Sequence, residues 1–265
     1  MDAVIHGDCL DELKKLPDNS VDLVLTSPPY DSAREYKGNL AWDFEKTASE
    51  LTRIIKPNGV IVWNVADQTK DFCESLTSFK QAISFVENHQ CLLVDTIVYA
   101  KNNFPAPYPN IKRYAHCFEY VFVLAKTKSF TFNPLKDRPN NNAGKRSVSS
   151  SRNVDGTMRK LPSSITPATS IRTNVWTYTT GWRHSYTDEI VKGHPAVMHI
   201  QLAKDVISSF SNPRDVVLDP FLGSGTTALA AKMLNRQYIG IEREKDYVEI
   251  AEARLKSINP LPLVA

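Results

Sequence analysis

The chain has 265 residues, enough to bury a substantial core as one domain with an insertion or as two small lobes. Its formal net charge of +3 is too small to indicate a nucleic-acid partner by itself. Four cysteines without C-x-x-C spacing argue against a disulfide framework and a zinc site, and no apolar run resembles a signal peptide or a membrane span. Composition therefore predicts a soluble intracellular protein.

Short apolar runs alternate with helical patterns along most of the chain. This alternation predicts βαβ units and a mostly parallel sheet covered by helices on both faces, an α/β fold. In chain order, the predicted strands span residues 21–25, 60–65, 92–99, 120–125, 216–218 and 238–241. The predicted helices span residues 10–16, 45–55, 72–86, 198–210, 226–234 and 246–255.

The first predicted strand runs directly into the sequence Thr-Ser-Pro-Pro-Tyr, residues 26–30. Because two prolines fix φ at successive positions, the Ser27 side chain and the Pro28 carbonyl point in set directions. Two such oxygens can accept both hydrogens of an exocyclic amino group and aim the nitrogen lone pair at a methyl donor. Tyr30 offers a stacking face for a base removed from its helix. Taken alone, however, the stretch would be interpreted as a rigid turn with a half-buried tyrosine.

The apolar periodicity is lost between residues 126 and 170. The stretch at residues 133–160 is dense in Asn, Ser and Pro, and composition favours a solvated, partly disordered loop. The alternative is a mobile basic arm that contacts phosphates, and the two interpretations are compatible because such arms order on binding. The stretch contains two acidic residues, Asp137 and Asp155, and a larger number of basic residues, namely Lys136, Arg138, Lys145, Arg146, Arg152, Arg159 and Lys160.

A late strand leads through Asp219-Pro220-Phe221 into Gly223-Ser224-Gly225 and a helix that begins at Thr226. The next strand ends at Glu242, about twenty residues after the glycines, as in nucleoside-binding βαβ units. The glycines allow a close approach to a ligand, and a carboxylate at a strand end can bind both ribose hydroxyls. Neither G-x-G-x-x-G nor Gly-Lys-Ser/Thr is present, so a nucleoside without phosphate fits better, and S-adenosylmethionine is the common one.

A plainer interpretation of the glycines is a tight turn without a ligand, and of Glu242 a solvent-facing strand end. In open α/β sheets, ligands bind at the carboxyl ends of the strands. If strands 21–25 and 216–218 are neighbours, Tyr30 and the glycine loop therefore face one pocket.

With both stretches present, the chain resembles the amino-methylating DNA methyltransferases, in the circularly permuted group whose catalytic tetrapeptide precedes the S-adenosylmethionine loop. The signature (Asp/Asn/Ser)-Pro-Pro-(Tyr/Phe) matches residues 27–30, and the cofactor motif matches residues 219–227. The resemblance covers most of residues 4–126 and 172–257. It implies a Rossmann-like, doubly wound, mostly parallel seven-stranded sheet in a catalytic domain of residues 1–126 and 172–265. The basic insertion, residues 127–171, is where the family places its target-recognition region.

The resemblance assigns roles to residues that match the family's motifs. The implied catalytic residues are Ser27, Pro28, Pro29 and Tyr30. The implied cofactor-binding residues are Asp8, His194, Pro195, Asp219, Pro220, Phe221, Gly223, Ser224, Gly225, Thr226 and Glu242, and no metal is implied. The basic residues expected to contact DNA are Lys112, Arg113, Lys145, Arg146, Arg152, Arg159 and Lys160. Plainer roles stay open for Asp8 as a helix N-cap, Pro195 as a first-turn proline, and Lys112 and Arg113 as solvated side chains.

Serine at position 27, in place of Asp or Asn, is the pattern associated with cytosine-N4 methylation in this family, and adenine-N6 is the alternative. Methylation of RNA or of a protein amide, and a non-catalytic DNA-binding module, are further alternatives. The basic insertion argues against a small amide, and the intact motifs argue against the module. The implied partner is double-stranded DNA, with no membrane partner and a cytoplasmic, nucleoid-associated location. A homodimer and a cognate restriction endonuclease, as in restriction–modification pairs, stay open.

Overall fold

The computed structural model describes residues 2–29, 42–103, 112–148, 150–181 and 197–257. Contacts divide the chain into two compact units, one of Met1–Asn133 with Asn174–Ala265 and one of Pro134–Thr173. Within the described ranges, every helix is too short or too polar to cross a membrane.

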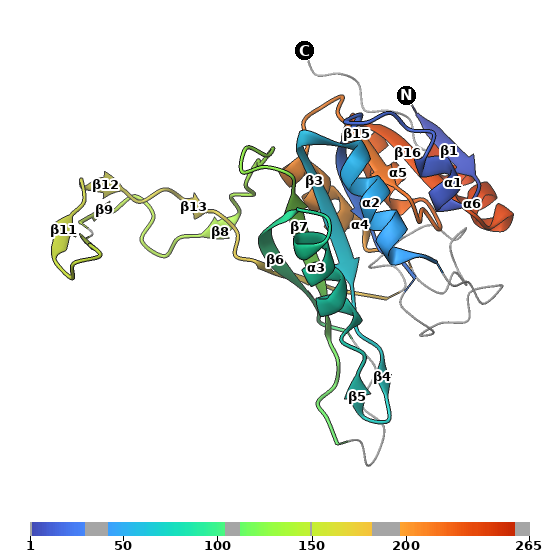
Figure 1. Cartoon of the computed structure of the whole chain (residues 1–265). Helices are drawn as coiled ribbons and strands as arrows, with labels where there is room; N and C mark the ends of the chain where they lie inside the picture. The colour runs from blue at the N-terminus through green and yellow to red at the C-terminus, as the bar shows by residue number, and fades with distance from the viewer. Residues whose placement is uncertain (1, 30–41, 104–111, 149, 182–196, 258–265) are drawn as a thin grey trace. The chain divides into compact units, whose positions relative to one another are not determined.

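The larger unit is built on one eight-stranded sheet (Figure 1). Its strand order is β1-β16-β15-β2-β3-β7-β6-β14, and every neighbouring pair is parallel except the two pairs made by β7. The predicted mostly parallel sheet is confirmed, with eight strands among the described residues where seven were expected. The strands are β1 Ala3–His6, β2 Val21–Thr26, β3 Ile55–Val65, β6 Leu92–Lys101, β7 Phe118–Ala125, β14 Val175–Tyr178, β15 Val216–Asp219 and β16 Gln237–Glu242.

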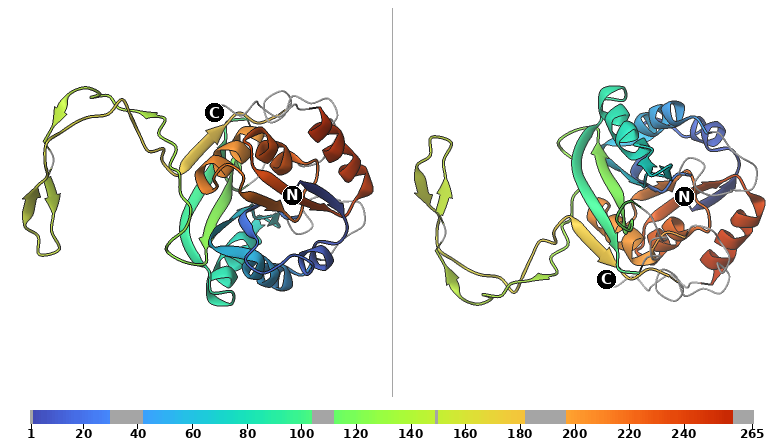
Figure 2. Two further views of the ribbon diagram at one scale, coloured as in Figure 1. Left: turned by 90° about the horizontal axis from the view of Figure 1, so that it is seen from above. Right: turned by 90° about the horizontal axis from the view of Figure 1, so that it is seen from below.

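Helices cover both faces of this sheet, with α1, α2 and α3 on one face and α4, α5 and α6 on the other (Figure 2). The second helix shows why these segments fold as they do: the Asp43 side chain accepts a hydrogen bond from the Lys46 amide, and Leu51 and Ile54 are buried one turn apart. The helices are α1 Cys9–Leu13, α2 Phe44–Ile54, α3 Thr77–Glu87, α4 Ile200–Phe210, α5 Thr226–Met233 and α6 Lys245–Lys256.

The core beneath α2 and α3 is centred on Trp63 of β3, which is fully buried. Its ring packs edge-on against Phe44 and Phe85, with centroids 6.0 and 5.3 Å away. The indole nitrogen donates to Gln81 Oε1 at 2.8 Å, so the polar end of this buried ring has a partner. The carboxyl end of β3 is therefore held in a well-packed setting next to β2.

The helix expected at residues 72–86 begins at Thr77 instead. Residues 69–74 form a small hairpin of β4 (Thr69–Lys70) and β5 (Cys73–Glu74). Asp71, Phe72 and Leu76 have φ values of 50°, 65° and 59°, which no α-helix accommodates. The helical prediction for residues 72–76 is wrong because the apolar spacing of Phe72 and Leu76 imitates the periodicity of the helix that follows.

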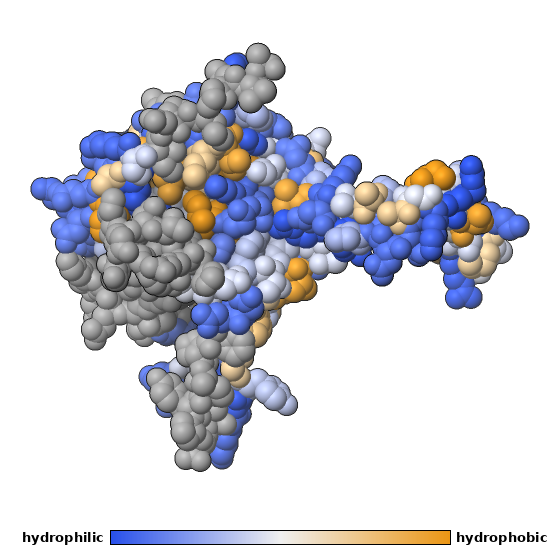
Figure 3. Space-filling model, turned by 180° about the vertical axis from the view of Figure 1, so that it is seen from behind, coloured by the Kyte–Doolittle hydropathy of each residue, from blue (hydrophilic) through white to orange (hydrophobic). Residues whose placement is uncertain are grey.

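The smaller unit is a ribbon of nested antiparallel pairs rather than the irregular loop expected from composition. The pairs are β8 (Arg138–Pro139) with β13 (Thr169–Ser170), β9 (Arg146–Ser147) with β12 (Ser164–Ile165), and β10 (Ser150–Arg152) with β11 (Met158–Lys160). Polar side chains support the ribbon, as where Ser170 Oγ donates to Asn140 Oδ1 at 2.7 Å. Its surface is mainly hydrophilic, with scattered apolar side chains (Figure 3). Its assignment to target recognition stays a prediction.

Candidate active site

The two motifs meet at one edge of the sheet. Strands β2 and β15 are parallel neighbours, with Leu23 opposite Val217 and Val24 opposite Leu218. Their carboxyl ends therefore lie side by side, which confirms the neighbouring strands on which the shared site depends. Ser27, Pro28 and Pro29 follow β2 directly, whereas Tyr30 lies outside the described residues.

Asp219, at the end of β15, links the two motifs through its buried carboxylate. Oδ1 accepts a hydrogen bond from Thr26 Oγ1 at 2.7 Å, and Oδ2 accepts one from Thr227 Oγ1 at 2.7 Å. Thr26 directly precedes Ser27, and Thr227 lies in the first turn of α5. The side chain predicted to bind the cofactor is only 4% exposed and points into the protein. The Asp219 carboxylate therefore joins the tetrapeptide to the glycine loop, and we call the three residues Thr26, Asp219 and Thr227 the clamp.

Burial disfavours the ionised form of the Asp219 carboxyl group. Loss of solvation raises the pKa of Asp219 from 3.8 to about 6, although hydrogen bonds from Thr227, Thr26 and the Phe221 amide oppose the shift. Because the folded state holds the proton up to about pH 6 and the unfolded state releases it near 3.8, the free energy of unfolding falls as the pH rises through this window.

Replacing Asp219 with Asn is expected to remove this pH dependence. The amide keeps one acceptor and one donor for the two threonine hydroxyls but carries no charge. Between pH 4.5 and 7.5, the wild-type free energy of unfolding should fall by about 2 kcal/mol more than that of the variant, measured by denaturant titration. Asp215→Asn, at a less buried carboxylate that accepts from the Asn212 amide, is the control. Equal pH slopes for Asp219→Asn and the wild type would contradict the assignment.

The glycine loop has a backbone that only small residues accommodate. Gly223 and Gly225 have φ values of 53° and 84°, in the left-handed region that favours glycine. A Cβ on Gly225 would lie 2.7 Å from the Cβ of Ala251 on α6. Leu222 packs on Gly240 of β16, where an added Cβ would lie 2.5 Å from Leu222 Cδ2. The loop is thus pressed between β16 and α6.

Glu242, at the end of β16, holds the loop from one side. Oε2 accepts a hydrogen bond from the Gly223 amide at 2.7 Å, and Oε1 accepts one from the Glu244 amide at 2.8 Å. Burial raises the pKa of Glu242 above its ordinary value. A carboxylate has about four acceptor positions, so these two bonds leave capacity for ribose hydroxyls. The predicted ribose contact therefore fits the geometry.

Arg254 holds the loop from the other side, and sequence reasoning missed it. Its guanidinium is 1% exposed, and Nη1 donates to the Ser224 carbonyl at 2.6 Å and lies 3.2 Å from Thr226 Oγ1. The hydroxyls of Ser224 and Thr226 therefore face Arg254 inside the protein. A cofactor contact at these two residues would be made by their main-chain atoms. The available signal was an arginine on the same helix face as the apolar Ala251 and Leu255.

Ser27 is the first member of a series of polar contacts that extends across four neighbouring strands, from β2 to β6. Asn64 Nδ2 of β3 donates to Ser27 Oγ at 3.3 Å and to Glu119 Oε2 of β7 at 2.8 Å. Glu119 pairs in turn with Lys101 of β6. Because a carboxylate accepts from Asn64, the amide nitrogen rather than its oxygen faces Ser27. Asn64, Glu119 and Lys101 were not singled out from the sequence, since their proximity arises only in the folded sheet.

The remaining implied cofactor residues divide into three groups. Asp8 follows β1 and N-caps α1 by accepting from the Leu10 amide at 3.0 Å, so its plainer role is confirmed and a cofactor contact stays a prediction. Pro220 and Phe221 lie at the turn after β15, where the Phe221 ring centroid is 5.1 Å from that of Trp42. His194 and Pro195 lie outside the described residues.

The residues expected to contact DNA occur in both units. In the larger unit, Lys112 is exposed and Arg113 donates to Glu74 Oε1 of the β4–β5 hairpin at 3.2 Å. In the smaller unit, all five expected residues are exposed, namely Lys145, Arg146, Arg152, Arg159 and Lys160.

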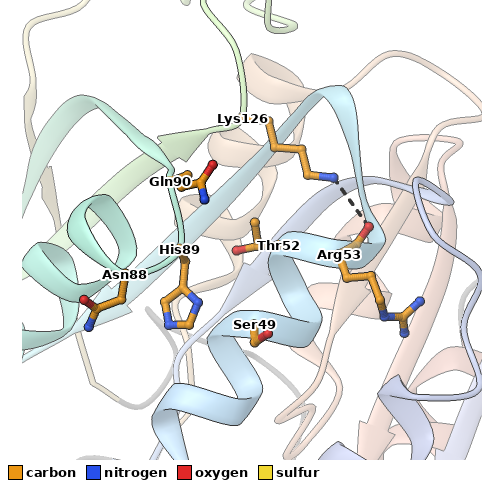
Figure 4. A pocket seen from close by; sticks show the side chains of 7 residues that line it. All are labelled: Ser49, Thr52, Arg53, Asn88, His89, Gln90 and Lys126. Atoms are coloured by element: carbon orange, nitrogen blue, oxygen red, sulfur yellow. Dashed lines mark hydrogen bonds between the residues drawn. The ribbon is translucent and has the colours of Figure 1, made fainter.

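A separate surface pocket lies where β3 begins and β7 ends, at the opposite edge of the sheet from Ser27 (Figure 4). Its cations serve the fold: Arg53 pairs with Glu50 and Asp18, and Lys126 Nζ donates to the Ile55 carbonyl at 2.6 Å. It is therefore not the candidate active site. The lining residues are Ser49, Thr52, Arg53, Asn88, His89, Gln90 and Lys126.

Comparison with known proteins agrees with this geometry. Residues 21–253 match a family model described as DNA methylase. The orphan methyltransferase M.BamHII of Bacillus amyloliquefaciens is 41% identical over 247 residues, 92% of each chain. The type II methyltransferase M.HinfI of Haemophilus influenzae is 30% identical over 290 residues, 99% of this chain and 70% of the relative.

Two solved structures share the fold. The PvuII DNA methyltransferase (cytosine-N4-specific) is 19% identical with a TM-score of 0.70, over 100% of this chain and 88% of that one. The complex of M1.HpyAVI with S-adenosylmethionine is 26% identical with a TM-score of 0.62, over 96% of this chain and 99% of that one. The Rossmann-like, doubly wound fold expected from the sequence is confirmed.

Proposed function

The chain belongs to the DNA methylase family that methylates the exocyclic amino groups of cytosine (N4) or adenine (N6) with S-adenosylmethionine, and from this we propose that it methylates N4 of cytosine in duplex DNA. The observation that carries the proposal is the clamp of Thr26, Asp219 and Thr227. It fixes the end of β2 against the glycine loop. An amino nitrogen held at Ser27 and a cofactor held by the loop then share one edge of the sheet.

The loop residues fit S-adenosylmethionine, which supplies an activated methyl group when bound. Gly223 presents no side chain that would block a close approach to the main chain, and the Ser224 hydroxyl faces Arg254 instead. Glu242 offers acceptors for the ribose hydroxyls at the adjacent strand end. We assign cofactor binding to Gly223, Ser224, Gly225 and Glu242, and we assign Asp219 and Arg254 to holding the loop in shape.

Ser27 and Pro28 orient the amino group that is methylated. Asn64 Nδ2 donates to Ser27 Oγ, and in the proposed complex the same oxygen accepts one hydrogen of the amino group. The Pro28 carbonyl accepts the other hydrogen, and together the two oxygens favour a pyramidal nitrogen whose lone pair can form the new carbon–nitrogen bond. Ser27 is too weak a base to remove a proton first. The carbon–nitrogen bond would therefore form as the methyl carbon–sulfur bond breaks, and the nitrogen would then lose its proton to water.

Cytosine is preferred over adenine because of the residue at position 27. A neutral hydroxyl suffices to hold the amino group of the smaller pyrimidine, and serine is the pattern that the resemblance associates with cytosine-N4 methylation. The solved structure of the cytosine-N4-specific PvuII enzyme shares this fold. Adenine-N6 methylation, within the same family, is the second candidate.

The basic ribbon is proposed to bind and read the DNA. Arg152, Arg159 and Lys160 lie exposed near the turn of the β10–β11 pair, and a two-stranded ribbon fits the major groove of B-DNA. The orphan relative at 41% identity favours a solitary enzyme over a restriction–modification pair. We place the enzyme in the cytoplasm, where its substrate DNA and a reducing environment for its four free thiols are found.

The experiment that tests the proposed function compares substrates side by side. Purified enzyme and methyl-labelled S-adenosylmethionine are incubated with duplex DNA, RNA and protein, and incorporated label is counted. Label is expected in DNA only. Label confined to RNA or protein would contradict the proposal, and cofactor binding without transfer would favour a non-catalytic DNA-binding module.

A further inference from the structure

The β4–β5 hairpin has a tight turn that its sequence disfavours. Thr69 pairs with Glu74 and Lys70 with Cys73, so Asp71 and Phe72 form a two-residue turn. Both have positive φ, 50° and 65°, as a type I′ turn requires. Such turns favour Asn-Gly or Asp-Gly, because glycine occupies the second position without strain. Here a phenylalanine stands where glycine is preferred.

The fold does not compensate for this strain by burying the ring. The Phe72 side chain is 61% exposed. A bulky residue in the left-handed region is a true outlier, and such outliers gather at functional sites. Phe72 therefore combines a backbone conformation that opposes its presence with an aromatic surface presented to solvent. Contact with a partner would be a reason to keep an exposed ring at a position that favours glycine.

The hairpin extends from the same sheet edge as the candidate active site. Asn64, next to last in β3, contacts Ser27, and the hairpin follows directly after the end of β3 (Figure 1). Hydrogen bonds hold the two ends of the hairpin where it joins the rest of the protein. The Ser75 amide donates to the Gln68 carbonyl at 2.9 Å, and Asp67 accepts from the Ser78 amide at 3.0 Å. The turn is thus carried on a fixed support beside the place where the target base is expected.

Charges around the turn nearly balance. The hairpin and the residues next to it carry two acidic side chains, Asp71 and Glu74, and three basic ones, Lys70, Lys112 and Arg113. Arg113 forms an ion pair with Glu74. Phosphate binding calls for an excess of positive charge. An apolar ring on a nearly neutral turn instead suits the base stack, where proteins that distort DNA insert Phe, Leu, Ile, Met or Pro.

We propose that Phe72 inserts its ring into the DNA duplex at the position that the target base vacates. This rests on the proposed function, in which the base leaves the helix to reach Ser27. Removal of a base from the stack is unfavourable, and a ring that fills the gap stabilises the opened duplex. Phe72 thereby lowers the free energy of base extrusion and takes no part in the transfer step.

The test compares Phe72→Gly with the wild type on two duplexes, one fully paired and one with a mismatch at the target base. On paired DNA, the variant should methylate about tenfold more slowly under single-turnover conditions. This factor corresponds to the lower part of the range of stacking free energies for one base. On mismatched DNA, where extrusion is easier, the two proteins should have similar rates. Thermal stability should be equal or higher in the variant, because glycine relieves the strained turn.

Two further variants give the test its controls. Phe72→Trp retains a large ring and should restore the rate on paired DNA. Phe79→Ala removes another exposed ring, 41% accessible on α3, and should leave the ratio of paired to mismatched rates at the wild-type value. With 2-aminopurine at the target position, Phe72→Gly should also reduce the fluorescence rise that accompanies base extrusion.

The outcomes separate this inference from the function on which it rests. A wild-type protein that methylates neither duplex overturns both. An active wild type with a Phe72→Gly variant of equal rate on paired DNA, or one that loses the same factor on both duplexes, overturns the role of Phe72 alone.

Discussion

Replacing Ser27 with alanine is expected to lower the rate of methyl transfer by about 10²- to 10³-fold, the loss typical of one preorganised hydrogen-bonding group. The variant lacks the oxygen that we propose accepts one hydrogen of the target amino group. Asn64 Nδ2 also loses the Ser27 acceptor, but it keeps Glu119 at 2.8 Å. Affinity for S-adenosylmethionine should stay near wild type, because the glycine loop is held by Glu242 and Arg254.

The measurement pairs single-turnover rates with calorimetric titration of the cofactor. Ser20→Ala is the control, since Ser20 Oγ donates to the Pro17 carbonyl before β2 begins, at the opposite end of the strand from Ser27. That variant should methylate DNA at close to the wild-type rate. A Ser27→Ala enzyme with nearly full activity, or one whose defect lies wholly in cofactor affinity, would contradict the role given to Ser27.

Replacing Gly225 with alanine is expected to destabilise the larger unit by about 2 to 4 kcal/mol and to abolish measurable cofactor binding. The left-handed φ of 84° is one source of the loss. The other is steric, since the new Cβ would lie 2.7 Å from Ala251 Cβ and 3.0 Å from Ala251 Cα. Ala251 is fully buried on α6, so relief requires the loop itself to move away from this helix.

Gly156→Ala separates the two contributions. Gly156 has a similar φ of 87°, but an added Cβ there meets no atom within 4 Å. This control should leave the unfolding of the larger unit and the affinity for S-adenosylmethionine near wild type. Denaturant titration and calorimetry test both proteins. If Gly225→Ala were as mild as Gly156→Ala, the close packing of the loop on α6 would be wrong.

Local patterns in the sequence were sufficient to predict the sheet and its two motifs. The apolar runs at β2, β3, β6, β7, β15 and β16 are each bounded by turn residues, and their alternation with helices indicates a mostly parallel sheet. That β2 lies next to β15 was a condition that the sequence left open and the structure supplies. The edge strands β1 and β14 are only four residues long and carry too weak a pattern. The two- and three-residue strands of the ribbon carry no usable alternation at all.

The contacts that shape the site could not be predicted, because they join distant parts of the chain. Thr26 and Asp219 are 193 positions apart, and Arg254 is 30 positions from Ser224. From the sequence, Asp219 was assigned to the cofactor, whereas its carboxylate is occupied by two threonine hydroxyls. The strained turn at Phe72 was hidden for the opposite reason, since its apolar spacing continues the pattern of α3.

The central claim is that this edge of the sheet transfers a methyl group to an exocyclic amino nitrogen of a DNA base. The most direct measurement is to treat unmethylated DNA with the enzyme and S-adenosylmethionine, digest it to nucleosides and identify the product by mass spectrometry. We expect N4-methylcytosine from the wild type and, in the same reaction time, about 10²- to 10³-fold less of it from Ser27→Ala. N6-methyladenine would keep the reaction and change the base, whereas a ring-methylated cytosine, or no methylated nucleoside, would contradict the claim.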